Sequence, residues 1–208
     1  MTNKKQGNLF IISAASGAGK TSLVKRILSE NKNISLSISH TTRKARSSEI
    51  EGKDYFFVKD DEFNEMKNKG QFLETAICHG FSYGTSKNTI KEMQNLGKDI
   101  IFEIDWQGVK SIKTIFSEAI AIFILPPSIQ KLEERLVARG QDSLDIIKAR
   151  LSAAKSEMSH IDQFDYVTIN EDFDDAVKDL NSIIRAEKLK TKLQQFNHQD
   201  LIKQLINP

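Results

Sequence analysis

The sequence contains little cysteine, little net charge and no long apolar run. Because Cys78 is the only cysteine, we expect no internal disulfide and no cysteine pair for a zinc ion, which suits a reducing cytoplasm. The 30 basic and 28 acidic residues leave a net charge of +2, so we expect neither a nucleic acid nor a membrane surface as a partner. The apolar run at 9–15 is too short to span a membrane, and the polar residues before it do not resemble a signal peptide. These features together predict a cytoplasmic protein.

What is present is an alternation of strand-like and helix-like segments. A chain of 208 residues, 39% of them hydrophobic, is long enough for one sizeable core with a small inserted subdomain. Short apolar runs predict strands at 8–14, 34–39, 99–105, 119–125 and 165–170. Apolar residues at helical spacing predict helices at 20–29, 106–115, 128–140 and 143–160. This alternation predicts an α/β fold, with a parallel sheet flanked by helices.

The pattern changes within residues 40–97 and again after Phe173. Short aromatic pieces at 55–58, 72–79 and 81–83 surround a single predicted helix at 60–69, which favours a small mixed subdomain over the sheet edge. From Phe173 the apolar residues follow helical spacing with charges between them, so we expect a helix at least to about Lys192. The tail at 189–208 is expected either to pack on the body or to take part in a homo-oligomer.

The segment between the first predicted strand and the first predicted helix matches a phosphate-binding loop. Its pattern is G-x-x-x-x-G-K-[ST], with Ala14 in the place of the first glycine. Such a loop wraps backbone N–H groups around a phosphate at the positive end of a helix. The lysine then reaches the β and γ oxygens of ATP, and the hydroxyl of Thr21 binds Mg²⁺. The residues expected to bind ATP here are Ala14, Ala15, Ser16, Gly17, Ala18, Gly19, Lys20 and Thr21.

The alternative for this segment is an ordinary glycine-rich turn that binds no ligand. The lysine, the threonine and the flanking strand and helix argue against this alternative. A phosphate loop by itself does not distinguish a kinase from a GTPase or an ATP-driven motor, since all of them need the same cradle. The second substrate must therefore be inferred from other residues.

Two arginines three positions apart and a nearby tyrosine suit a monophosphate. Arg43 and Arg46 can pair with phosphate oxygens through their guanidinium forks, and the phenol of Tyr55 can donate to a third oxygen. A solvated basic turn is the alternative for such a pair taken alone. Further segments complete an ordered pattern: Gly70–Glu74, Tyr83–Thr85, Ile101–Gly108, Leu125–Ser128, Arg135–Gly140 and Ala149–Leu151.

In order and spacing, these segments over residues 8–188 resemble the guanylate kinases. The resemblance implies a P-loop NTPase core at 8–39, 98–127 and 161–188, a GMP-binding subdomain at 40–97 and a helical lid at 128–160. It also implies an enzyme that transfers the γ-phosphoryl group of ATP to GMP, and to dGMP, with Mg²⁺, in guanine nucleotide biosynthesis and recycling. Within that family pattern Arg43 and Asp105 count among the catalytic residues.

The resemblance also assigns residues to the guanine base. Guanine presents N1–H and a 2-amino group as donors beside the O6 acceptor. Glu74 would accept from both donors and Thr85 would donate to O6, whereas adenine would leave the buried carboxylate unpaired. The family pattern adds Ser39 at the base, Tyr83 at the GMP phosphate, and Asp105 between base, phosphate and Mg²⁺. Taken alone, Glu74 would be an ordinary exposed strand carboxylate.

The helix pair at 128–160 resembles the family's lid. Its arginines would close on ATP and on the transferring phosphoryl group, and closure would exclude water. These arginines are Arg135, Arg139 and Arg150. Taken singly, each is as readily a solvated helix residue, and Arg139 could be a helix C-terminal charge. By the same resemblance Asn170 would lie on the adenine side of ATP.

Two other functions remain open at this point. Some guanylate-kinase-like domains have lost catalysis and bind phosphopeptides, but this chain keeps Lys20, Thr21 and the lid arginines. The second is a kinase for another monophosphate such as AMP or UMP, against which Glu74 and Thr85 argue because they match a guanine edge.

Overall fold

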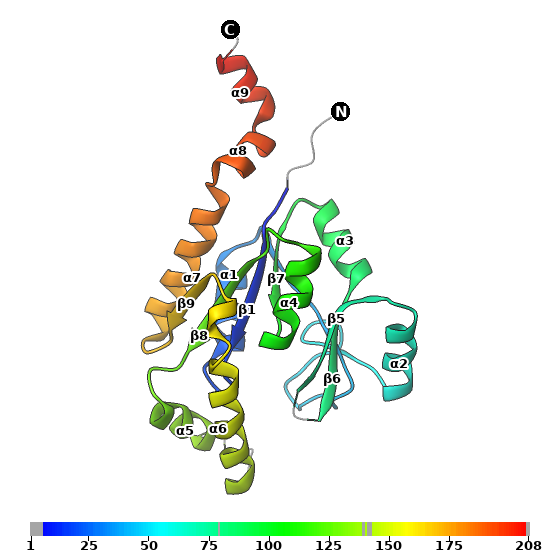
Figure 1. Ribbon diagram of the computed structural model, residues 1–208, viewed down its shortest axis with the longest axis vertical. Coiled ribbons are helices and arrows are strands. Elements are labelled where there is room, and N and C mark those ends of the chain that lie inside the picture. Colours follow the sequence, from blue (N-terminus) through cyan, green and yellow to red (C-terminus); the bar gives the residue numbers. More distant parts are fainter. Residues whose placement is uncertain (1–5, 79, 139, 141–142, 207–208) are drawn as a thin grey trace.

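The computed structural model describes residues 6–78, 80–138, 140 and 143–206. Its core is a parallel sheet in the order β2-β7-β1-β8-β9, as the alternation of segments predicted (Figure 1). The central strand pairs on both sides, with Phe10 opposite Ile101 of one neighbour and Ile120 of the other. The five strands are β1 (Leu9–Ala14), β2 (Ile34–Ser37), β7 (Asp99–Glu103), β8 (Ile120–Leu125) and β9 (Tyr166–Ile169).

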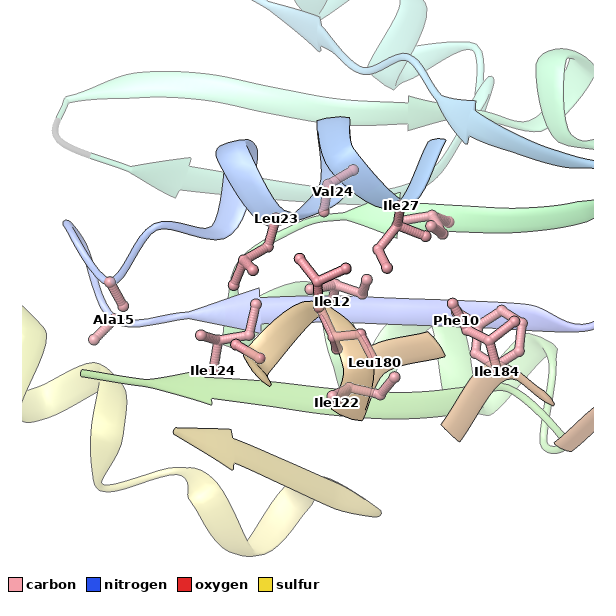
Figure 2. Close-up of a cluster of buried hydrophobic side chains, with 14 of the residues drawn as sticks. Phe10, Ile12, Ala15, Leu23, Val24, Ile27, Ile122, Ile124, Leu180 and Ile184 are labelled. Atoms are coloured by element: carbon pink, nitrogen blue, oxygen red, sulfur yellow. The ribbon is translucent and has the colours of Figure 1, made fainter. Parts of the chain in front are cut away.

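Helices cover both faces of this sheet because its central strands are apolar on both faces. On one face, α1 (Lys20–Glu30) and α7 (Phe173–Lys188) pack on Phe10 and Ile12 of β1 (Figure 2). Leu180 of α7 lies in this cluster. On the other face, α3 (Lys87–Asn95) and α4 (Trp106–Ile115) cover the alternate residues of the same strands. Burial of each large aliphatic side chain stabilises the fold by about 1.5–3 kcal/mol.

A second, smaller sheet lies between β2 and β7 in the sequence, and its strand order is β4-β3-β6-β5. Its elements are β3 (His40–Thr41), β4 (Phe56–Phe57), α2 (Asp60–Asn68), β5 (Phe72–Cys78) and β6 (Phe81–Ser86). Stacking of Phe63 on Phe72, with centroids 4.7 Å apart, attaches α2 to this sheet. The prediction of a single helix in this region was wrong, because α3 follows β6. The short apolar pattern of α3, with Ile90 as its one buried residue, explains the omission.

The predicted helix pair is present as α5 (Ile129–Ala138) and α6 (Leu144–Met158), followed by a short 3-10 turn, η1 (Ile161–Gln163). The hydroxyl of Ser128 accepts the Lys131 N–H at 3.0 Å, which caps the start of α5. Both helices contribute buried residues to the same core cluster as α1. The helices α5 and α6 thus connect β8 to β9, the edge strand of the parallel sheet.

The C-terminal tail is helical to the end of the described chain but not continuous. The sequence predicted helix at least to about Lys192, and helix does continue past that residue, but α7 ends at Lys188 and is followed by the separate helices α8 (Thr191–Asn197) and α9 (Gln199–Ile206). The tail extends away from the sheet (Figure 1), and the side chain of Asn197 exchanges hydrogen bonds of 2.8 and 3.1 Å with the backbone of Gln6. None of the described helices is both long and apolar enough to cross a membrane.

Candidate active site

The loop between β1 and α1 has the backbone of a phosphate cradle. Gly17 and Gly19 have φ angles of 93° and 100°, a left-handed region that favours glycine, and Gly19 caps the start of α1. Ala14 is the last residue of β1 and has extended backbone, so glycine is not needed there. The loop thus keeps its shape despite the substitution at its first position.

Lys20 and Thr21 reach from this loop to the C-terminal end of the neighbouring strand β7. The ammonium of Lys20 donates to the carbonyl of Ile104 at 3.0 Å, and the hydroxyl of Thr21 donates to Oε1 of Glu103 at 2.5 Å. In open α/β sheets, ligands bind at the carboxyl ends of the strands. Sequence reasoning missed Glu103, since its importance depends on β7 pairing with β1.

The phosphate loop and the second sheet face the same cavity, which has a volume of about 240 Å³. The loop supplies one wall. The other walls are formed by Ser39, Arg46, Tyr55, Glu74, Ala76, Cys78, Tyr83, Glu103, Ile104, Asp105, Arg150 and Glu157. Most of the residues predicted from separate segments of the sequence are therefore brought to a single site.

The basic turn predicted to hold a phosphate is organised around Glu49. Arg43 donates from both terminal nitrogens to this carboxylate, at 2.8 and 3.0 Å, and from Nε to the hydroxyl of Tyr83 at 3.3 Å. The Arg46 N–H also donates to Glu49, at 2.7 Å, while its side chain is 55% exposed and lines the cavity. Burial raises the pKa of Tyr55, so its phenol keeps its proton and can donate it. Sequence reasoning did not identify Glu49.

Glu74 and Thr85 face each other across strands β5 and β6. The Thr85 hydroxyl donates to Oε1 of Glu74 at 2.7 Å, so the predicted donor to guanine O6 is engaged with the carboxylate here. Both residues are buried, and Glu74 lines the cavity together with Ser39, which is also buried. Burial, assisted by the charge of Asp105, raises the pKa of Glu74 to about 7 although the hydrogen bond from Thr85 lowers it.

The raised pKa of Glu74 predicts a stability that depends on pH. The ordinary pKa of the carboxyl is 4.5 and the folded value is about 7, so the folded protein loses stability as pH rises between these values. At pH 8 the full cost is roughly 3 kcal/mol. We expect Glu74→Gln to raise the free energy of unfolding at pH 8, with little change at pH 4.5. Urea unfolding of both proteins at several pH values measures the difference, and a gain that does not depend on pH would contradict the assignment.

Asp105 lines the cavity and caps α4. Its Oδ1 accepts the N–H groups of Gln107 and Gly108 at 3.0 and 3.4 Å. Its Oδ2 accepts the Gln107 side-chain amide at 2.7 Å and the thiol of Cys78 at 2.9 Å. Burial raises the pKa of that thiol, so it remains a neutral donor. The Asp105 carboxylate is thus fixed in orientation by four donors.

Helix α6 contacts the phosphate loop through Ser16. Arg150 donates from Nε and Nη2 to the Ser16 hydroxyl, at 3.3 and 3.1 Å, and Glu157 accepts the Ser16 N–H at 2.7 Å. Residues 150 and 157 are two turns apart on α6 and therefore lie on one face of it. Glu157 was not predicted, since nothing in the local pattern of α6 distinguishes this acid from its neighbours.

Arg135 and Asn170 support the phosphate loop from outside. Arg135 donates to the carbonyl of Asn170 at 2.8 Å and to that of Ala18 at 3.4 Å. The amide of Asn170 donates to the same Ala18 carbonyl at 2.7 Å. Arg139, the third arginine predicted for the lid, lies outside the described residues.

Known proteins resemble this chain along nearly its whole length. The family model described as guanylate kinase matches residues 6–187. The chain is 50% identical over 201 residues to a guanylate kinase of Methylobacillus flagellatus, covering 97% of this chain and all of the relative. It is 49% identical to one of Cupriavidus metallidurans, covering 96% of this chain and 92% of the relative.

Solved structures also resemble this chain. The crystal structure of guanylate kinase from Anaplasma phagocytophilum matches with a TM-score of 0.76 and 32% identity, covering 94% of this chain and 97% of the other. The SH3-kinase fragment of tight junction protein 3 matches with a TM-score of 0.52, covering 90% of this chain and 60% of that fragment, but at 11% identity it shares the fold alone. The family model, the sequence relatives and the structure from Anaplasma phagocytophilum establish that the chain belongs to the guanylate kinase family.

Proposed function

We propose that this chain transfers the γ-phosphoryl group of ATP to GMP, giving ADP and GDP, and that dGMP is accepted as well. The observation that carries the proposal is the single cavity in which the phosphate loop faces Glu74 and Arg46. A donor site and an acceptor site must share one enclosed space for direct phosphoryl transfer. The reaction would serve guanine nucleotide biosynthesis and recycling in the cytoplasm, a location that the single cysteine supports.

At the donor end, the N–H groups of residues 14–21 bind the ATP phosphates, and Lys20 bridges the β and γ oxygens. The Thr21 hydroxyl and the Glu103 carboxylate place two oxygen atoms side by side, and Mg²⁺ prefers oxygen ligands. Among the described residues no cluster of three or more His, Cys, Asp or Glu is placed to hold a metal, as suits an ion that also relies on water and phosphate oxygens. Mg²⁺ held there would supply positive charge to the ATP phosphates.

At the acceptor end, Arg43, Arg46, Tyr55 and Tyr83 hold the GMP phosphate, and Glu74 accepts from guanine N1–H and the 2-amino group. Ser39 and Thr85 complete the base site. Asp105 lies between acceptor and donor, where its fixed carboxylate orients the two substrates. Residues 40–97 would therefore form the GMP-binding subdomain, and 128–160 the lid.

The chemical step needs charge stabilisation more than covalent help from the protein. An oxygen of the GMP phosphate bonds to the γ-phosphorus of ATP while the bond from that phosphorus to the bridging oxygen breaks, which releases ADP. Arg150, beside the loop at Ser16, and Arg135, beside Ala18, supply positive charge from the lid side, and Arg139 is proposed with them. Asn170 contacts the loop on the side where the adenine is proposed to lie.

An ADP-release assay with ATP and Mg²⁺ tests this function. GMP, dGMP, AMP, UMP and CMP are offered separately at equal concentration, with a control that lacks an acceptor. We expect rapid turnover with GMP and dGMP alone. Turnover with a different base would keep a kinase but remove the roles of Glu74 and Thr85, while no turnover with any acceptor would favour the non-catalytic binding module.

A further inference from the structure

Gly108 lies in the first turn of α4 and is buried against the carboxylate of Glu74. A Cβ atom at this position would be 2.9 Å from Oε2 of Glu74 and 2.8 Å from Cδ1 of Ile104. Both distances are shorter than real Cβ atoms show, so the Glu74 carboxylate and the Ile104 side chain would both have to shift. Glycine is the residue that allows α4 to approach the carboxylate this closely.

We propose that Gly108 is a specificity-determining residue for the acceptor base, acting as a positioning residue through Glu74. This inference rests on the proposed function, in which Glu74 accepts from guanine. The absence of a side chain at Gly108 leaves Oε2 where it lies, while Thr85 fixes the other oxygen of the same carboxylate. The two oxygens are thus positioned by different neighbours, and two donors on one edge of the base require both.

The atoms nearest to a Cβ at position 108 explain why a substitution of Gly108 would affect base recognition more than folding. The closest atoms to the added Cβ are the free ends of two side chains, which can rotate, and not backbone atoms. Alanine is also a better helix former than glycine, so α4 itself would not be weakened. The strain is therefore relieved by displacing the Glu74 carboxylate, and the loss appears in base recognition.

The position of Gly108 relative to Asp105 argues the same way. The Gly108 N–H donates to Oδ1 of Asp105 at 3.4 Å, so this one residue lies against two of the acids that line the cavity, Asp105 and Glu74. The charge of Asp105 is one of the causes that raise the pKa of Glu74. A shift of the Glu74 carboxylate away from α4 would change its distance from Asp105 as well as from the base.

The test compares Gly108→Ala with the wild-type chain and with Ser111→Ala, an exposed site on the same helix. We expect the Kd for GMP by calorimetry and the KM for GMP to rise about tenfold or more for Gly108→Ala. The kcat should change less than about threefold. The KM for ATP should not rise, and the melting temperature should not fall. Ser111→Ala should match the wild type. An unchanged Kd for GMP, or an equal loss for ATP, would overturn the inference.

A double variant separates action through Glu74 from general damage. In the Glu74→Ala background, Gly108→Ala should change kcat/KM for GMP less than threefold, because the group it displaces is gone. A tenfold loss in that background would show that Gly108 acts by another route and would overturn the inference. If the wild-type chain does not bind GMP, the proposed function and the inference fail together; binding that Gly108→Ala leaves unchanged removes only the inference.

Discussion

Replacement of Lys20 by alanine is expected to abolish phosphoryl transfer to every acceptor. The ammonium lies at the end of the phosphate loop, 3.0 Å from the Ile104 carbonyl, and it is the charge proposed to bridge the β and γ oxygens. That stabilisation is strongest when charge develops on the transferring group, so the main loss falls on kcat. We expect a decrease of about 10³-fold or more, equivalent to about 4 kcal/mol, in the ADP-release assay.

Two comparisons make the Lys20 result specific. Lys32→Ala removes an exposed lysine just after α1 and should keep the wild-type kcat. Lys20→Arg keeps the charge but replaces a compact ammonium by a planar fork, and it should recover little activity. Because Lys20 is only half-buried, the melting temperature should change little. A decrease in kcat of less than tenfold, with the fold intact, would contradict the role of Lys20.

Replacement of Glu74 by alanine is expected to erode the preference for GMP without abolishing transfer. The carboxylate is buried at 5% exposure, and a guanine bound without it would leave two donors unpaired. Because leaving buried donors unpaired costs about 1–3 kcal/mol, kcat/KM for GMP should fall roughly 5- to 150-fold relative to that for AMP. The acceptor panel measures this ratio directly, with Glu92→Ala, an exposed acid on α3, as the matched control.

The outcome that would contradict the assignment of Glu74 is an equal loss for all acceptors. Such a result would mean that the carboxylate supports the subdomain as a whole and does not read the base. The two variants are therefore most informative together, since Lys20→Ala should lower transfer for all acceptors alike and Glu74→Ala should change mainly their ratio.

Local patterns in the sequence were sufficient for the core but not for the contacts between distant segments. The strand, glycine-rich turn and helix around Lys20 form a continuous pattern of spacing and turn residues, so this unit was predictable. The helix α3 was missed because its apolar face is short. Strand limits differed by a residue or two, as for β2, where pairing with β7 ends at Ser37.

The acids of the site illustrate what the sequence could not supply. Glu49, Glu103 and Glu157 each contact a predicted site residue that is distant in the sequence or oriented by a turn. Their importance follows from strand order, from the fold of the basic turn and from the docking of α6. For Glu103 a signal existed, because an acid at the carboxyl end of a buried strand is a common ligand position. For Glu157, only the three-dimensional structure places it at the phosphate loop.

The central place of β1 affects the order in which a newly made chain can fold. The strand is synthesised before its partners, and Phe10 pairs with Ile101 and Ile120, which leave the ribosome only after the whole second sheet has been made. Until then the apolar segment before the phosphate loop has no partner in its own sheet, and pairing at such long sequence separation is slow. The proposed donor site is therefore completed only after β7 and β8 have been made, although most of its residues precede the second sheet in the sequence.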